Sequence, residues 1–173
     1  MKKRMLPLLL LACTTQAPAA ADNVHFSGTL VAEPCTLPDA DTDIRLDFGT
    51  VVTKYLYQYQ RTKSQPFAIH LQECDPAIMK TVSVTFRGTA DTELPDLLAT
   101  DASGTAKGVA VGIERQDGTL LPVNKASPEM SLVSGSTTLN FKAFVQIQPG
   151  ALAKRSLTEG SFTAISTFIL GYQ

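Results

Sequence analysis

The C-terminal segment, residues 160–173, constrains the fold more than any other part of the chain. Its residues alternate, and apolar side chains occur on both faces. One face carries Phe162, Ala164, Ser166, Phe168, Leu170 and Tyr172, and the other carries Thr163, Ile165, Thr167 and Ile169. This pattern is typical of a strand buried on both sides within a sheet, which needs a hydrogen-bonding partner on each edge. No residue follows Gln173 to form a further partner, so we expect a sheet one strand short that takes a strand from another polypeptide.

The first 21 residues have the pattern of a signal peptide. Lys2, Lys3 and Arg4 are followed by an apolar stretch at 5–12 and by small residues at 17–21. The apolar stretch is too short to span a bilayer as a helix. The full chain has 15 basic and 16 acidic residues. Cleavage after residue 21 removes three cations, so the mature chain is net negative, which argues against nucleic acid as a partner.

Two cysteines remain after the leader, and the third lies within it. In an exported chain Cys35 and Cys74 are expected to form a disulfide. Neither has a His or Cys at the spacing of a metal site, so no metal is expected. Leu-Leu-Ala before Cys13 resembles the lipidation signal of bacterial lipoproteins. A lipoprotein anchored at Cys13 therefore stays an alternative to a secreted chain.

The rest of the chain reads as strands separated by Gly and Pro turns. Alternation or short apolar runs predict strands at 24–31, 66–71, 81–86, 109–113, 139–147 and 160–172. Only residues 93–98 have a weak helical signal, enough for one turn. Many short strands in a chain of this length predict an all-β sandwich.

No arrangement of residues indicates an enzyme or a cofactor site. The chain has two His and lacks a Gly-x-Ser-x-Gly turn and a phosphate-binding Gly loop. We interpret Asp39, Asp41 and Asp43 as a solvated loop, and Asp91, Glu93 and Asp96 as surface charge. His70 is expected to be a hydrogen-bonded structural residue. The sequence therefore favours a protein that is not an enzyme and needs no cofactor.

Three tyrosines alternate at Tyr55, Tyr57 and Tyr59. On one side of an extended segment they would form a surface able to stack on a sugar or a base. We favour the alternative, in which they cover the sheet or a neighbouring subunit, because charged residues do not interleave with them.

Several segments together resemble the subunits of chaperone–usher pili. They are the start of the mature chain at 22–35, Leu-Gln-Glu-Cys at 71–74, Val-Thr-Phe-Arg-Gly at 84–88 and Gly-Val-Ala-Val-Gly-Ile at 108–113. At the C-terminus, Gly160 and the penultimate Tyr172 match the family's chaperone-recognition signature, with alternating apolar residues between them. Residues 26–30, 94–98 and 162–170 are most similar to the minor, adaptor-like tip subunits of P-type pili.

The resemblance implies an incomplete immunoglobulin-like β-sandwich that lacks its last strand and is completed by donor-strand complementation. A periplasmic chaperone lends a strand first, and at the outer-membrane usher the N-terminal extension of the next subunit replaces it. The donated residues here would be Val24, Phe26, Gly28 and Leu30. The resemblance places the residues of the accepting groove and the chaperone-binding strand at Gly160, Phe162, Phe168, Leu170, Tyr172 and Gln173.

This implies a domain order of signal peptide 1–21, donor-strand extension 22–33 and pilin domain 34–173. The chain would be a structural subunit exported through the periplasm to the cell-surface fimbrium, where it joins neighbouring subunits near the tip and contributes to adhesion. Two alternatives remain open within this family: a single-domain adhesive subunit that binds a host glycan, and a pilus-terminating subunit with a blocked groove. On pattern alone, residues 24–30 also fit an ordinary first strand of the domain's own sheet.

Overall fold

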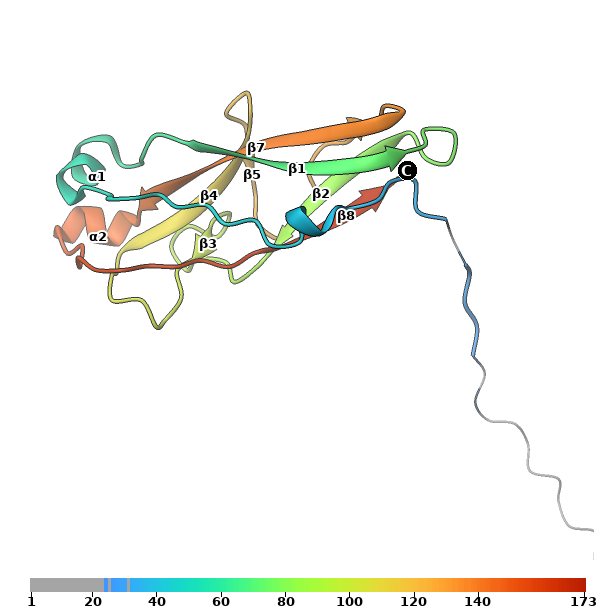
Figure 1. Cartoon of the computed structure of the whole chain (residues 1–173). Coiled ribbons are helices and arrows are strands. Elements are labelled where there is room, and N and C mark those ends of the chain that lie inside the picture. The colour runs from blue at the N-terminus through green and yellow to red at the C-terminus, as the bar shows by residue number, and fades with distance from the viewer. Residues whose placement is uncertain (1–23, 25, 31) are drawn as a thin grey trace, which may run out of the picture. The chain divides into compact units, whose positions relative to one another are not determined.

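The computed structural model describes residues 24, 26–30 and 32–173 (Figure 1). The chain divides into an N-terminal unit, up to residue 31, and a sandwich unit, Ala32–Gln173. Residue 24 and residues 26–30 have no regular secondary structure. The predicted signal peptide, with Cys13, lies outside the described residues. In the part of the chain that is described, no helix is long and apolar enough to cross a membrane.

The sandwich unit contains two antiparallel sheets. In the larger sheet the strand order is β1-β7-β4-β3, and β5 also pairs with β4. These strands are β1 (Gln65–Cys74), β3 (Leu98–Ala99), β4 (Val109–Arg115), β5 (Leu120–Leu121) and β7 (Gly135–Ile147). The register places Ile69 opposite Leu139 and Val111 opposite Val145.

The smaller sheet has the order β6-β2-β8. Its strands are β2 (Thr81–Arg87), β6 (Met130–Ser131) and β8 (Thr167–Tyr172). Val84 lies opposite Leu170, and Phe86 lies opposite Phe168. The five long strands thus overlap predicted segments; β1, β2, β4 and β7 extend beyond them, and β8 occupies only the end of the predicted 160–172. The short strands β3, β5 and β6 were not predicted.

The core lies between the two sheets, where period-two alternation turns every second side chain inward. Val82, Val84 and Phe86 of β2 are buried, as expected from their spacing. The Phe86 ring meets Phe141 of β7 edge-on at 5.2 Å between centroids, and Phe67 lies 5.6 Å from Phe141. A disulfide joins Cys35 to Cys74, as the sequence predicts. The sandwich is therefore built from alternating strands around an aromatic centre.

Two short helices depart from the expected all-strand pattern. They are α1 (Thr53–Tyr59) and α2 (Pro149–Lys154), and a 3-10 turn, η1, spans Asp39–Asp41. The prediction that the tyrosines share one side of an extended segment is wrong. Tyr55 and Tyr59 are four residues apart in α1, so their rings stack at 4.5 Å. The Tyr57 hydroxyl instead accepts a hydrogen bond from the Leu157 backbone N–H at 2.9 Å.

Two carboxylates expected at the surface are buried. Asp41 accepts hydrogen bonds from the backbone N–H and from Nδ1 of His70, the latter at 2.9 Å. His70 is thus the hydrogen-bonded structural residue that the sequence predicts. Asp91 accepts from the Gln148 side chain and from two backbone N–H groups of its own loop. Burial is tolerated because each carboxylate oxygen has donors within reach.

Candidate strand-accepting groove

Strand β8 has a partner on one edge only within the described part of the chain. It pairs along its full length with β2, from Val82 opposite Tyr172 to Arg87 opposite Thr167. No strand of the described residues pairs with its other edge. The chain before β8 continues this edge without being a regular strand. Ser161 and Thr163 bond through their backbone carbonyls to the N–H groups of Ala106 and Asp101. Backbone N–H and C=O groups alternate in direction along an extended chain. The backbone N–H and C=O groups of Phe162 and Ala164 therefore point toward the open edge.

Gly160 fixes this extended approach to β8. Its φ is +151°, and a Cβ there would lie 2.0 Å from Thr105 Oγ1. The same Thr105 hydroxyl accepts a hydrogen bond from the Ser161 N–H at 3.1 Å. Only glycine allows the backbone to lie this close to the 101–106 loop, which holds one wall of the open edge in place.

Residues 44–51 form the opposite wall. Ile44, Leu46 and Phe48 are half-buried, and the residues between them are exposed. Within the described chain, no backbone-to-backbone hydrogen bond is formed by this segment. Phe48 lies across from Phe162, with 6.3 Å between ring centroids. Two extended walls thus face each other, and each has backbone groups without a strand partner.

The faces of the β8 segment are not equally buried. Phe162, Ala164, Phe168, Leu170 and Tyr172 pack against the core. On the other face Ile165 is 73% exposed and Ile169 46% exposed. The expectation of a strand buried on both sides is therefore wrong. The sandwich has two layers, so no third layer covers the outer face of the smaller sheet.

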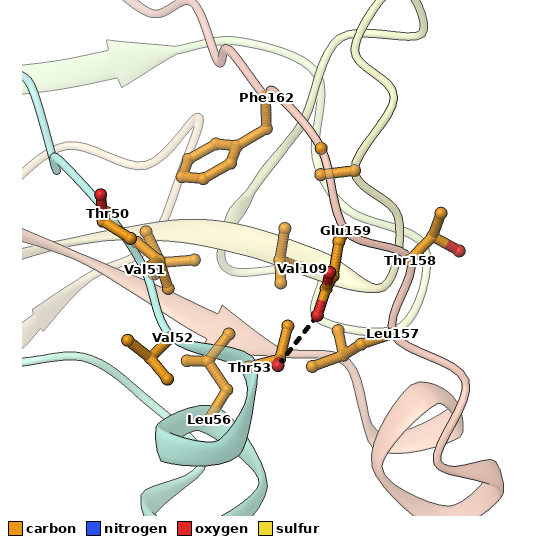
Figure 2. A pocket seen from close by; sticks show the side chains of 13 residues that line it. Thr50, Val51, Val52, Thr53, Leu56, Val109, Leu157, Thr158, Glu159 and Phe162 are labelled. Atoms are coloured by element: carbon orange, nitrogen blue, oxygen red, sulfur yellow. Dashed lines mark hydrogen bonds between the residues drawn. The ribbon is translucent and has the colours of Figure 1, made fainter.

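A pocket lies at one end of the two walls, and we call it the end pocket (Figure 2). Its volume is about 360 Å³, and both walls, α1 and the larger sheet contribute to it. The lining is mainly apolar, with Val51, Leu56, Val109 and Leu157 among its residues, and the Phe162 ring projects over it. At its rim the Thr53 hydroxyl donates to Glu159 Oε1 at 3.4 Å. The pocket can accommodate an apolar side chain.

At the other end of β8, the entry of the chain into the sandwich meets the C-terminus. Burial raises the pKa of the Tyr172 hydroxyl, and the negative charge of Glu33 raises it further. Gln173 is held by backbone hydrogen bonds with Lys80 and Thr81. The predicted chaperone-binding residues Phe168, Leu170, Tyr172 and Gln173 thus lie at the opposite end of the walls from the end pocket.

The predicted donor residues lie in the N-terminal unit. Val24 is 63% exposed, Phe26 95% and Leu30 101%. A Cβ on Gly28 would meet no atom within 4 Å. Sequence analysis did not identify the wall at 44–51. Its signal was the alternation of Ile44, Leu46 and Phe48 directly after the aspartate-rich segment.

Comparison with known proteins identifies the family. A model of the fimbrial protein family matches residues 24–173. The chain belongs to the fimbrial protein family. The major MR/P fimbria protein of Proteus mirabilis (strain HI4320) is 32% identical to this subunit over 180 residues, covering 100% of both chains. The putative minor fimbrial subunit PmfF of the same strain is 30% identical over 170 residues, covering 96% of this chain and 93% of its own.

Solved structures agree with this assignment. The P pilus rod subunit PapA has 25% sequence identity to this fimbrial subunit and a TM-score of 0.71, with 82% of this chain and 100% of PapA covered. A subunit in the structure of a chaperone–usher pilus gives a TM-score of 0.70 at 25% identity, covering 92% and 100%. The fold is an incomplete immunoglobulin-like β-sandwich, and the protein is a non-enzymatic subunit of chaperone–usher pili, which assemble into surface fibres.

Proposed function

We propose that this fimbrial subunit accepts a donated β-strand between the β8 edge and the wall at 44–51. The observation that carries the proposal is the pair of extended walls without strand partners, which ends in an apolar pocket. A strand inserted there would form backbone hydrogen bonds along β8 and bury alternate side chains on the core. Phe162, Phe168, Leu170 and Tyr172 would contact the inserted strand, and Gly160 would hold its wall in position.

The same chain donates residues 22–33 to the groove of a neighbouring subunit. Val24, Phe26 and Leu30 are apolar, alternate with polar residues, and are more than half exposed. Burying three such side chains would contribute roughly 5–8 kcal/mol before the cost of ordering the segment. Gly28 would pass where the groove leaves no room for a side chain. Residues 34–173 then form the accepting pilin domain.

Assembly would proceed through two partners. Residues 1–21 direct export, and a periplasmic chaperone covers the open edge, because an unpaired apolar edge otherwise invites aggregation. The Gln173 carboxylate is positioned to meet basic residues of that chaperone. At the outer-membrane usher the donor strand of the next subunit replaces the chaperone and the subunit joins the fibre.

We further propose a minor, adaptor-like position near the tip, where the subunit contributes to adhesion by linking its neighbours. The similarity of residues 26–30, 94–98 and 162–170 to tip subunits of P-type pili supports this position. The size of the end pocket, about 360 Å³, favours a strand acceptor over a terminating subunit with a blocked groove.

Peptide insertion tests the accepting role. The mature chain, kept soluble by its chaperone, is mixed with a fluorescent synthetic peptide of residues 22–33, and insertion is followed by anisotropy. A peptide with Phe26→Ala and Leu30→Ala is expected to bind about a hundredfold more weakly, because two buried apolar side chains are lost. The matched control carries Ser27→Ala and Thr29→Ala, whose side chains point away from the groove, and binds within about threefold of the unchanged peptide.

Equal binding of all three peptides would refute insertion by alternate apolar side chains. No binding of any would refute acceptance of this chain's own segment, and failure of the matching N-terminal peptides of sibling subunits as well would refute strand acceptance. Deletion of residues 22–32 tests the donating role separately. The shortened chain is expected to bind the peptide and yet fail to extend a fibre. Intact incorporation of the shortened chain into fibres would show that this segment is not the donor.

A further inference from the structure

The end of the sandwich that carries α1 and α2 exposes an excess of positive charge. We call Lys54, Lys63, Lys154 and Arg155 the basic end; all four are exposed. The ion pairs of the described residues involve none of them. Three carboxylates lie nearby: Glu93 accepts from the Gly150 N–H, Asp101 from Thr163 and Glu159 from Thr53. Their donors are uncharged, so the carboxylates keep their charge. Four cations against three carboxylates leave an excess of one positive charge among these groups.

The opposite end of the sandwich carries the complementary charge. We call Glu33, Glu73, Asp75 and Glu129 the acidic end; all four are exposed and occur in none of the described ion pairs. The exposed Lys80 lies there too, because its N–H bonds to the Gln173 carbonyl, so four carboxylates and one cation leave an excess of three negative charges. Hydrogen bonds locate them at the C-terminal end of β8. The Asp75 N–H donates to the Pro34 carbonyl, and Glu129 accepts from Thr81, whose N–H bonds to Gln173. Figure 1 shows α1 and α2 at one end of the sandwich and the C-terminus at the other.

Both ends also expose apolar side chains. At the basic end Val52 is 57% exposed and Tyr59 54% exposed. At the acidic end the corresponding exposed fractions are 46% for Ile78 and 54% for Val133. Each end therefore combines charge of one sign with apolar surface, a composition suited to contact with a protein surface of opposite charge.

The proposed strand insertion brings these two ends together. The chain enters the sandwich at Pro34, on the acidic end, and only three residues separate Leu30 from Pro34. The four residue-to-residue steps from Leu30 to Pro34 span at most about 14 Å. If Leu30 of an incoming subunit fills the end pocket, the incoming acidic end must lie within that distance of the basic end. Insertion in the reverse direction would place the acidic end of the incoming subunit against the acidic end of the acceptor. The acceptor's own N-terminal extension leaves from that same end.

We propose that the basic end of one subunit docks the acidic end of a second copy of this chain, as a contact separate from strand insertion. The inference rests on the proposed strand donation, which supplies the geometry. Because one chain carries both complementary surfaces, a copy can follow a copy in the fibre. The contact orients consecutive domains and speeds their encounter through electrostatic attraction. The same contact would form wherever two copies of this chain follow each other in the fibre, whether the fibre contains two copies or many.

Charge reversal tests the contact. The double variant Lys54→Glu with Lys154→Glu removes attraction at the basic end, and neither side chain is in a described hydrogen bond. Head-to-tail assembly of the chaperone-released mature chain is followed by light scattering at about 0.1 M and about 1 M salt. We expect assembly of the variant to slow by roughly tenfold at the lower salt, with most of the difference lost at the higher salt.

Adding Glu73→Lys and Glu129→Lys to that variant, both outside the donor segment, reverses the acidic end as well and is expected to restore assembly. The matched control, Arg87→Glu with Lys125→Glu, has the same change of net charge away from both ends. It is expected to assemble within about twofold of the unchanged chain. Insertion of a synthetic 22–32 peptide, which lacks the acidic-end residue Glu33, is measured for every variant, because it reports on the groove and on correct folding.

The outcomes separate this proposal from strand insertion. Normal peptide insertion with slowed, salt-sensitive assembly that the fourfold variant restores supports the contact. Normal peptide insertion with unchanged assembly of the double variant overturns the contact and leaves strand insertion intact. Slowing by the control as much as by the double variant also overturns it, since net charge alone would then be responsible. Failure of the peptide to enter the unchanged chain overturns insertion of a second copy and this proposal with it, whereas acceptance of a strand from a different subunit is tested by the sibling peptides.

Discussion

At the scale of single residues, Glu114 shows how the sandwich tolerates a buried charge. Its side chain is 4% exposed, and it accepts hydrogen bonds from Ser64 at 2.5 Å and from Arg61 at 2.8 Å. The Arg61 guanidinium also lies 3.5 Å from the centre of the Phe144 ring. Burial raises the pKa of Glu114, but the bonds from Ser64 and Arg61 and the charges of Arg61 and Lys142 outweigh it, so the pKa lies below its ordinary value.

This shift predicts how stability depends on pH. Because the folded pKa is lower than the unfolded one, Glu114 stabilises the fold above about pH 4.5, and this contribution is lost as the pH falls through the folded pKa. Glu114→Gln is expected to lower the free energy of unfolding by about 1–3 kcal/mol at pH 7, with a smaller difference at acidic pH. Urea unfolding of the peptide-bound chain, followed by circular dichroism, measures both. Exposed Glu129→Gln is the control and should change less than about 0.5 kcal/mol. Parallel pH curves for Glu114→Gln and the unchanged chain would contradict the assignment.

At the scale of elements, the two faces of β8 differ in what they contribute. Leu170 packs on the core, whereas Ile169 lies on the outer face at 46% exposure. Leu170→Thr is expected to lower the free energy of unfolding by about 2 kcal/mol, because an apolar contact is replaced by a hydroxyl. Ile169→Thr serves as the matched change on the adjacent residue, with an expected loss below about 0.5 kcal/mol. Urea unfolding distinguishes them, and equal losses would mean that the outer face is covered in solution.

The elements also show what sequence patterns predict and what they miss. The alternation of β2 and β7 predicts their inward faces, because a strand in a two-layer sandwich has one buried side. The same period-two rule fails at Tyr55, Tyr57 and Tyr59, where tertiary contacts such as the Tyr57 to Leu157 hydrogen bond favour a helix. α2 begins at Pro149, directly after the predicted strand at 139–147; proline ends a strand pattern but also suits the first turn of a helix, so the pattern alone did not predict α2.

Part of the candidate groove was likewise predicted from the sequence, and part was not. The residues of β8 that face the groove were identified because their alternation continues to the chain end. The wall at 44–51 was missed because it forms no backbone-to-backbone hydrogen bond within the described chain, so no neighbouring strand or hairpin turn indicates it in the sequence. The end pocket was not predictable, since its lining comes from segments as distant in sequence as Val51, Val109 and Leu157.

At the scale of the whole molecule, the Cys35–Cys74 disulfide closes a loop with a sequence separation of 39 that contains the wall at 44–51 and α1. Replacing both cysteines by serine is expected to lower the free energy of unfolding by about 3–4 kcal/mol, because the unfolded chain gains freedom. The denaturant midpoint of the peptide-bound chain measures the loss. The unchanged chain in reducing buffer should show a similar midpoint, and a loss below about 1 kcal/mol would show that the crosslink contributes little.

The same crosslink has a mechanical consequence. The polypeptide enters the sandwich at Pro34, next to Cys35, and the covalent bridge leads directly to the end of β1, which pairs with β7 over most of its length. A pulling force applied at residue 33 therefore passes through the disulfide to the edge strand β1 and its ladder with β7, and bypasses residues 36–64. The wall at 44–51 stays out of the line of tension, so under the proposed strand insertion a stretched filament would not open the groove that holds its neighbour.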